Sequence, residues 1–558
     1  MGLPGLSLQG TLSVAALGLN AQQSALRVIG QNISNVNTPG YSLQTIVLEP
    51  LGNLLGVNAT NVFRNSDNLI SGRIYDETSS EKFLESKISL LSQVEAFLNE
   101  SQTEGINGAL NEFFNSLQDL SLRPDGIAER EGVLGSASIF INELNRTARA
   151  INNIQVSADN KIREVVTEIN TITKEIARLN VESLTANSTI PGGGNSLLDQ
   201  RDELVRQLSE LIDVRVIYDS NGSATVLTKG SGYTLVANNV SSDLSVQPNA
   251  NNKNYLDVYI GSNKTISYNI TNSILGGELG GLIAVRDVST NNVIDNLDRM
   301  TATLINEFNK IHRTGFGLDG STGLDFFQPL TARGTHNVNN IGDASITASI
   351  TDYNALTYDN YIIEFQDVPP LTYNIYREGD LTTPIATGAY NSGVPISIEG
   401  LSITITDGAG GPPSAGDKFY VSTREGATQN IALNPVVASD INKIASSSDL
   451  NQLPGNNDIA LQLANLIDAR IFQNGSANIS NYYGAIVSQL GTDLKSANTT
   501  LESQHSIVEQ LTNIREQISG VSLDEESIKL MAYQRGFQAS SRVITIVDEL
   551  LQELVNIL

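Results

Sequence analysis

The sequence predicts an α+β, multidomain protein in which the N- and C-terminal helices pair in a coiled-coil or helical-bundle stalk that carries inserted β-rich domains. Three observations support this prediction. The chain has 558 residues, more than a single hydrophobic core usually serves. Both ends of the chain repeat apolar residues every seven positions, as coiled-coil helices do. Two internal stretches instead alternate apolar and polar residues, as half-buried strands do.

The first helix is expected to start near Ser7. Its apolar residues recur every seventh position, at Leu12, Leu19, Leu26 and Ile33. A second row, formed by Leu8, Ala15 and Ile29, is interrupted by Gln22. An amphipathic helix of an ordinary core would show a similar pattern, so this pattern alone does not distinguish the two kinds of helix.

The stretch GQNISNVNTPGYS, residues 30–42, follows this helix. Asparagine side chains can bond the last helical carbonyls, and asparagine tolerates the left-handed backbone found at helix ends. Thr-Pro-Gly-Tyr fits a type II turn with proline and glycine at its centre. A plain helix stop needs fewer special residues, so we single out Asn32, Asn35, Thr38, Pro39, Gly40 and Tyr41 as a signature turn.

The interior of the chain divides by its periodicity. Apolar residues at helical spacing predict a rod domain from residues 51–213, 276–335 and 429–514. Alternating segments between Asn, Gly, Asp and Pro turns predict a β-rich insertion at 214–275 and an outer β domain at 336–428. Residues 1–50 and 515–558 remain as a terminal coiled-coil domain. If the two ends pack together, every β domain is an insertion in the helical stalk.

The last helix has a start signal and a long seam. Gly520 breaks the chain, and Ser522 with Glu525 forms a capping-box pattern. Apolar residues then recur every seventh position from Leu530, and a second row with the same spacing begins three residues later, at Tyr533. The apolar residues of these rows that we expect at an interface are Leu530, Phe537, Ile544, Val547, Leu551, Leu554 and Leu558.

Composition argues against several classes of function. The formal charge of −26 repels phosphate backbones and anionic headgroups, so we expect no nucleic-acid partner. No apolar stretch is long enough to predict membrane insertion, and the chain has no cysteine. Neither the three histidines nor acidic pairs such as Asp202 and Glu203 form a recognisable catalytic or metal-binding pattern. We therefore expect no enzyme, no cofactor and no metal, and we expect the acidic pairs to be solvated or capping.

Two end segments resemble a known family. ALRVIGQNISNVNTPGYSLQT, residues 25–45, and LMAYQRGFQASSRVITIVDELLQELVNIL, residues 530–558, resemble the paired signatures of flagellar rod, hook and hook-associated proteins. The usual first signature has alanine at Ser34 and often a basic residue at Leu43. Ordered internal motifs, including LLDQRDELV at 197–205 and HRTGFGLDGSTGLDFF at 312–327, resemble the FlgK-type, hook-filament junction members of that family.

The resemblance implies a structural subunit of the bacterial flagellum that joins hook to filament. It implies export by the flagellar type III apparatus without a cleaved signal peptide, and an extracellular location at the hook-filament junction. The implied partners are further copies of the chain in a ring, the hook protein below, a second junction protein (FlgL-type) above, and a cytosolic export chaperone (FlgN-type) on the C-terminal helix.

Alternatives remain open from the sequence. Another flagellar axial protein, such as a hook or distal-rod subunit, would share both end signatures. A secreted adhesin could use the β insertions, and a cell-wall hydrolase could use acidic residues. The heptad ends would be unexplained in an adhesin, and no catalytic pattern supports a hydrolase.

Overall fold

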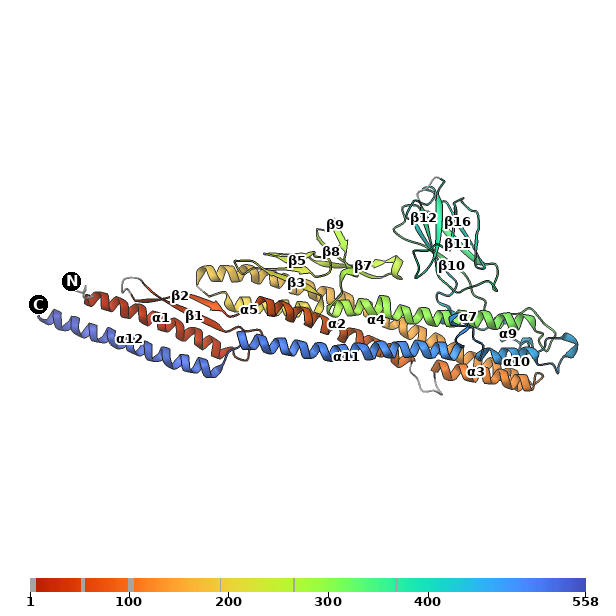
Figure 1. Ribbon diagram of the computed structural model, residues 1–558, viewed down its shortest axis with the longest axis horizontal. Helices are drawn as coiled ribbons and strands as arrows, with labels where there is room; N and C mark the ends of the chain where they lie inside the picture. The colour runs from red at the N-terminus through yellow and green to blue at the C-terminus, as the bar shows by residue number, and fades with distance from the viewer. Residues whose placement is uncertain are drawn as a thin grey trace.

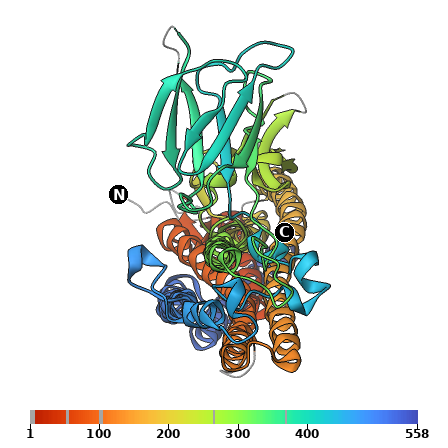
Figure 2. The same ribbon diagram turned by 90° about the vertical axis from the view of Figure 1, so that its right-hand side faces the viewer.

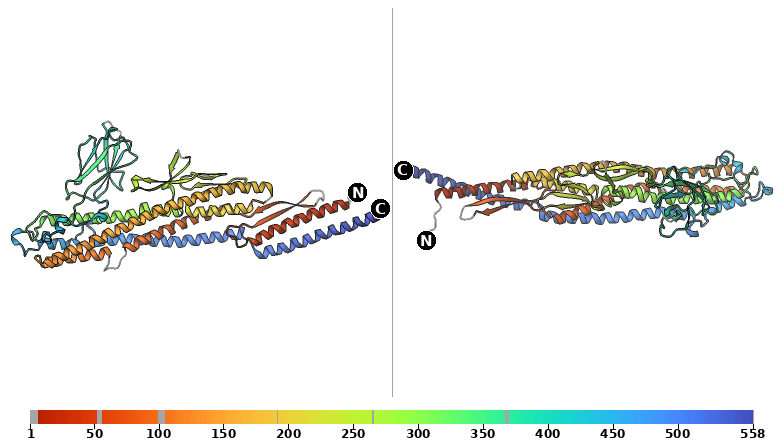
Figure 3. Two further views of the ribbon diagram at one scale, coloured as in Figure 1. Left: turned by 180° about the vertical axis from the view of Figure 1, so that it is seen from behind. Right: turned by 90° about the horizontal axis from the view of Figure 1, so that it is seen from above.

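The chain folds into a long helical rod with two β regions on one side and both termini at one end (Figure 1). This computed structural model describes residues 7–51, 56–98, 105–190, 192–263, 266–366 and 370–557. A view from behind shows the same arrangement, with the terminal helices extending beyond the rod (Figure 3). The predicted fold class, paired end helices with inserted β-rich domains, is confirmed.

The terminal helices lie side by side and antiparallel. Helix α1 spans Leu8–Ser34 and α12 spans Leu523–Ile557. Strands β1 (Gln44–Pro50) and β2 (Val57–Arg64) form an antiparallel hairpin that packs on α1. The sequence did not predict this hairpin, since residues 1–50 were assigned to the terminal coiled coil and residues 51–213 to the helical rod. A β-bulge between Val47 and Leu48 interrupts the alternation along its strands.

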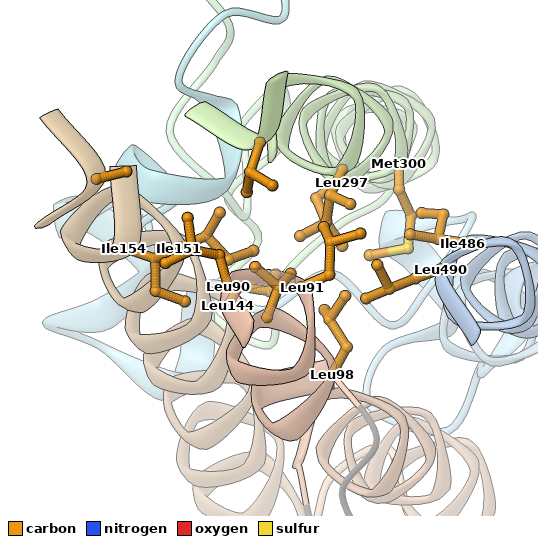
Figure 4. Packing of buried hydrophobic residues seen from close by; sticks show 14 of the residues in the cluster. Leu90, Leu91, Leu98, Leu144, Ile151, Ile154, Leu297, Met300, Ile486 and Leu490 are labelled. Carbon is orange, nitrogen blue, oxygen red and sulfur yellow. The ribbon is translucent and has the colours of Figure 1, made fainter. Parts of the chain in front are cut away.

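The rod is built from long helices that share one apolar core. These helices are α2 (Asn68–Leu98), α3 (Gly105–Leu122), α4 (Ile127–Thr189), α5 (Asn195–Leu211), α6 (Gly277–Ala284), α7 (Thr290–Thr314) and α11 (Ile479–Ser519). A π-helical turn, η3 (Val285–Ser289), joins α6 to α7. Figure 4 shows side chains of α2, α4, α7 and α11 meeting in this core. Within the described residues, the main buried cluster runs from Tyr75 to Leu494 and includes no residue of α1 or α12.

The inner β region consists of two small antiparallel sheets beside α4. Their strands are β3 (Val214–Tyr218), β4 (Ala224–Thr228), β5 (Thr234–Ala237), β6 (Val240–Ser241), β7 (Leu244–Asn249), β8 (Tyr255–Asn263) and β9 (Ile266–Asn269). Asparagines on α4 attach them: the Asn170 side chain bonds both backbone groups of Leu244, and Asn180 bonds both backbone groups of Ala224.

The outer β domain has a five-stranded and a three-stranded antiparallel sheet, in the orders β10-β17-β12-β13-β14 and β11-β16-β15. Their strands are β10 (Arg333–His336), β11 (Ser345–Ile350), β12 (Tyr361–Gln366), β13 (Thr372–Arg377), β14 (Ala386–Ala389), β15 (Ile396–Ile398), β16 (Leu401–Thr406) and β17 (Lys418–Ser422). The end-on view shows the domain standing above the helices (Figure 2). It has its own buried apolar cluster, separate from that of the rod.

The chain returns to the rod through short helices and 3₁₀ turns rather than through one long helix. The α-helices here are α8 (Ala427–Asn430), α9 (Pro435–Ala438) and α10 (Asp458–Ala464). Residues 429–514, predicted as helical rod, thus begin with about fifty residues of compact loop structure before α11. Asx caps from Asn434, Asp440 and Asp449 start several of these turns.

Candidate functional site

The signature turn ends α1 through side-chain caps. The Asn35 side chain donates to the carbonyl of Gln31 at 2.9 Å, which satisfies one of the last helical acceptors. The Thr38 hydroxyl donates to the side-chain oxygen of Asn35 at 3.2 Å, and the Thr38 backbone N–H donates to the Asn35 carbonyl at 2.9 Å. The asparagine therefore links the helix to the turn that follows it.

Residues 38–41 form a tight turn as the sequence suggests. The N–H of Tyr41 donates to the carbonyl of Thr38 at 3.2 Å, and Gly40 has a φ of +79°, as the third residue of a type II turn requires. A Cβ on Gly40 would lie 3.3 Å from the Cβ of Glu203 on α5. Glycine is favoured at this position for two reasons: its backbone is left-handed, and a side chain would crowd Glu203 of α5. Pro39 is exposed at the outer corner.

Asn32 is the centre of the site. Its side chain is 1% exposed. The side-chain nitrogen donates to the carbonyl of Gln44 at 2.9 Å and to Oε2 of Glu526 at 2.8 Å. Its oxygen accepts from the Tyr41 hydroxyl at 2.8 Å and from the Gln44 N–H at 3.1 Å. All four hydrogen-bonding positions of the amide are used, and they connect α1, the turn, β1 and α12.

Glu526 completes the connection from the other end of the chain. It lies 494 residues from Asn32 and is 2% exposed. Lys529, one turn further along α12, places its ammonium 2.8 Å from the second carboxylate oxygen. Both oxygens of this buried charge therefore have partners, which a stable buried carboxylate needs. Burial and the nearby carboxylates of Asp199 and Glu526 raise the pKa of Tyr41, so its hydroxyl stays protonated as a donor.

A charged cluster fixes the turn and hairpin to the rod. Arg64 at the end of β2 pairs with Asp199 and Asp202 on α5, and Arg201 also pairs with Asp202. Asp202 was expected to be solvated or capping, but its side chain is 15% exposed and pairs with two arginines, so that expectation was wrong. Burial raises the pKa of Asp199 to about 6, while the Arg64 guanidinium opposes this rise. Asp199 and Asp202 belong to the LLDQRDELV motif, which therefore contributes to the joint.

The α11 helix reaches the same place. The Leu43 N–H donates to the carbonyl of Ser519 at 2.8 Å, and Arg515 donates to the carbonyl of Gly40 at 2.9 Å. We call this assembly of the signature turn, the start of α12, the end of α11 and the charged cluster on α5 the joint. It is where the terminal helix pair meets the rod.

The expected interface residues lie along the α1–α12 pair, and most of them are half-buried. The half-buried ones are Leu12, Leu19, Leu26, Ile33, Leu530, Phe537, Ile544 and Leu551. Val547 is buried, Leu554 is 52% exposed, and Leu558 lies outside the described residues.

Glycines lie where the two terminal helices approach each other, which the heptad pattern did not indicate. A Cβ on Gly536 would lie 2.9 Å from the Gln22 side chain, and a Cβ on Gly18 would lie 3.3 Å from the Ser540 hydroxyl. Gln22, which interrupts the second apolar row, thus lies against a glycine of α12.

The outer side of α12 keeps further apolar side chains in contact with solvent. Val543, Ile546 and Leu550 are 39%, 48% and 45% exposed. They flank the row that faces α1, so the helix has more apolar surface than its intramolecular partner covers.

Two histidines outside the joint, His312 and His505, bond other parts of the protein. Burial lowers the pKa of His312 to about 4, and its two ring nitrogens bond Leu324 O at 2.7 Å and Ala445 N at 3.0 Å. His505 pairs with Glu81 at 2.7 Å. The described ranges hold no group of three or more His, Cys, Asp or Glu placed to bind a metal ion. None of the helices in these ranges combines the length and apolar character needed to cross a bilayer.

Comparison with known proteins matches three segments of the chain to flagellar families. Residues 91–327 match the flagellar hook-associated protein FlgK helical domain. Residues 12–41 match the flagella basal body rod protein family, and residues 516–557 match the C-terminal family of flagellar basal body rod FlgEFG proteins. The last two segments include the two sides of the joint, Asn32 and Glu526.

Whole-chain relatives agree with these matches. The chain is 27% identical over 553 residues to flagellar hook-associated protein 1 of Escherichia coli, covering 97% of this chain and 98% of the relative. It is 24% identical over 585 residues to the protein of the same name from Bacillus subtilis, covering 98% and 97%. In fold it is similar to the flagellar hook junction protein FlgK from Burkholderia pseudomallei, with a TM-score of 0.69 at 18% identity, covering 80% of this chain and all of that one.

These matches confirm the resemblance to FlgK-type flagellar hook-associated proteins that the sequence motifs indicated. The matched family models and relatives are flagellar hook-associated and rod proteins and not enzymes, which agrees with the expectation from the sequence.

Proposed function

We propose that this chain, a relative of the FlgK-type flagellar hook-associated proteins, is a structural subunit that joins the hook to the filament of the bacterial flagellum. One observation carries the proposal. Two segments matched to flagellar rod families, at opposite ends of the chain, meet in one joint through the Asn32–Glu526 hydrogen bond. The joint fixes how the terminal helices leave the rod, and this direction decides how subunits can stack.

Assembly of the subunit into a ring rests on the surface of the terminal pair. Val543, Ile546 and Leu550 lose water only when another chain covers them. Complete burial of such side chains contributes about 1.5–3 kcal/mol each. The main core of the rod does not depend on this pair. The rod can therefore fold first while the helix pair remains available to neighbouring copies.

The further partners follow from the same family. In the assembled flagellum the ring lies between the hook protein and a second, FlgL-type junction protein. Before assembly, an FlgN-type export chaperone covers residues 522–558, which keeps the apolar side of α12 from associating with other proteins. The chain then leaves the cell through the flagellar type III apparatus and acts outside it.

Another axial role, as a hook or distal-rod subunit, would also use the two matched end segments. The match of residues 91–327 to the FlgK helical domain favours the junction role, because this region lies in the rod between the shared ends. We therefore propose the junction role and treat the other axial role as an outcome of the test.

The test replaces exposed apolar residues of α12 in motile cells that carry this chain as their only copy. The double variant Ile546→Asp/Leu550→Asp should fold normally but leave cells with hooks that lack attached filaments, seen by electron microscopy. The control is Ile139→Asp, which changes an apolar residue of α4 that is 56% exposed, outside the terminal pair.

Deleting residues 1–45 or 523–558 should have the same effect on filaments while leaving a folded rod. Normal filaments in the α12 variant would refute the assembly role of that surface. Attached filaments in cells that lack the gene would refute the junction role itself, and loss of the hook would point to the other axial role.

A further inference from the structure

The outer β domain and the rod have separate apolar cores. The buried cluster of the outer domain lies between Ala344 and Val421. The cluster of the rod contains no buried residue from that range. Among the described residues, only the half-buried Ile350, Tyr353 and Tyr358 pack against both clusters. Apolar burial therefore contributes little to fixing the domain on the rod.

Polar side chains make the attachment instead, most of them on α7; the Asn251 side chain of the inner β region also bonds the Asn337 side chain and the Val338 N–H. Asp295, Arg299 and Asn306 are spaced by four and seven residues, so they lie on one face of the helix. The opposite face carries Leu297 and Leu304, which are buried in the rod core. The helix thus presents its apolar side to the rod and its polar side to the outer domain.

Arg424 is the strongest of these contacts. It lies just after β17, where the chain leaves the outer domain, and its side chain is 5% exposed. Its guanidinium donates to both carboxylate oxygens of Asp295 at 2.8 Å each and also to the carbonyl of Tyr358. Such two-point pairing of a guanidinium with a carboxylate fixes direction as well as distance.

Two more contacts hold the same edge of the domain. Arg299 donates to Asp359 at 2.9 Å, and Asp359 also pairs with Arg377 of β13 at 2.9 Å. Asn306 donates to the Tyr353 carbonyl and to the Tyr358 hydroxyl, both at 2.7 Å.

Tyr358 itself has a left-handed backbone, with a φ of +58°. A bulky L residue rarely adopts this conformation. Its hydroxyl and its carbonyl both bond residues outside the β sheets, and these bonds hold the strained residue in place.

We propose that these contacts form a releasable polar clasp, with Arg424 and Asp295 at its centre, and that the outer β domain turns as a rigid body on the rod when the clasp opens. The domain keeps its own core when released, because Arg424 and the α7 side chains of the clasp are not part of that core, and Tyr353 and Tyr358 lie only at its margin. The rod likewise keeps its core. The clasp thus sets the orientation of the domain without setting its fold.

The test uses spin-label distances in the full chain. The chain has no cysteine, so Val394→Cys in the outer domain and Ile139→Cys in α4 place one label on each side. Both positions are exposed, at 54% and 56%. The parent protein should give one narrow distance distribution. Arg424→Gln, and separately the milder Asp295→Asn, should broaden it and add a second population.

The matched control is Arg178→Gln, which breaks ion pairs to Glu175 and Glu182 on α4, away from the clasp. This variant should keep the narrow distribution. Amide hydrogen exchange in β12, β16 and β17, whose residues supply the buried core of the outer domain, should be unchanged in all variants. A narrow distribution in both clasp variants would overturn the proposal. Faster exchange of these strands in both would also overturn it, because the contacts would then belong to the fold of the domain.

Discussion

Replacing Asn32 with alanine tests the joint most directly. The substitution removes four hydrogen bonds and leaves the Tyr41 hydroxyl, both backbone groups of Gln44 and one oxygen of Glu526 without this partner. A hydrogen bond between neutral groups contributes about 1 kcal/mol, and one to a charged group about 2 kcal/mol. The sum is about 5 kcal/mol, and water entering the space left by the side chain reduces the loss to about 3–4 kcal/mol.

This loss should appear locally, because the rod core includes no residue of α1 or α12 in the part of the chain that the structure describes. We expect amide hydrogen exchange in α1 and α12 to accelerate by about two to three orders of magnitude, since about 1.4 kcal/mol corresponds to tenfold. Exchange in α4 and α7 should not change. Asn37→Ala is the control, because Asn37 is an exposed asparagine of the same segment. Equal exchange in Asn32→Ala and Asn37→Ala would refute the role given to Asn32.

Three further predictions concern the same region. Gly40→Ala should destabilise the joint by about 1–2 kcal/mol in urea unfolding, because Gly40 has a φ of +79° and its Cβ would press on Glu203; an unchanged midpoint would show that the turn relaxes. Gly536→Val should push α12 away from Gln22 and accelerate exchange in both terminal helices, and adding Gln22→Ala should restore part of the protection; no rescue would mean that the two residues do not meet. The pKa of Asp199 is about 6 in the folded protein, against an ordinary value of 3.8, so folding favours the protonated carboxyl. The stability that this preference contributes is complete below pH 3.8 and is lost as the pH rises through 6. Stability should thus increase by about 1 kcal/mol from pH 7 to pH 5 through this group, and Asp199→Asn should remove that part of the pH dependence.

The sequence predicted the long helices and the β regions because each depends on a local period. The apolar row on α11, for example, needs only residues three and four positions apart. The joint depends on something else. Asn32 could be recognised as a helix-ending residue, but its partner Glu526 is 494 residues away, and no local pattern connects them.

Buried charge was the least predictable feature. Asp202 lies on a helix with many charged neighbours, and such a pattern usually indicates a solvated face. It is buried because Arg64, 138 residues earlier, ends the hairpin strand β2 beside it. The hairpin itself was missed, so its arginine could not be assigned to the carboxylates. Because the β1–β2 hairpin was not predicted, the ion pairs of Arg64 with Asp199 and Asp202 could not be predicted either.

The separation of Asn32 and Glu526 along the chain has a consequence for how the protein matures. Closing a flexible loop of nearly five hundred residues costs about 5 kcal/mol in chain entropy. The folded rod removes most of this cost, because α11 packs along α2 and ends at Ser519, whose carbonyl accepts from the Leu43 N–H just after the signature turn. The terminal helices can therefore pair at the joint only after the rod between them has folded, whereas the outer β domain has a core of its own. A subunit that lacks either Asn32 or Glu526 cannot form the hydrogen bond between the two ends. A formed joint therefore indicates that both ends of the polypeptide are present.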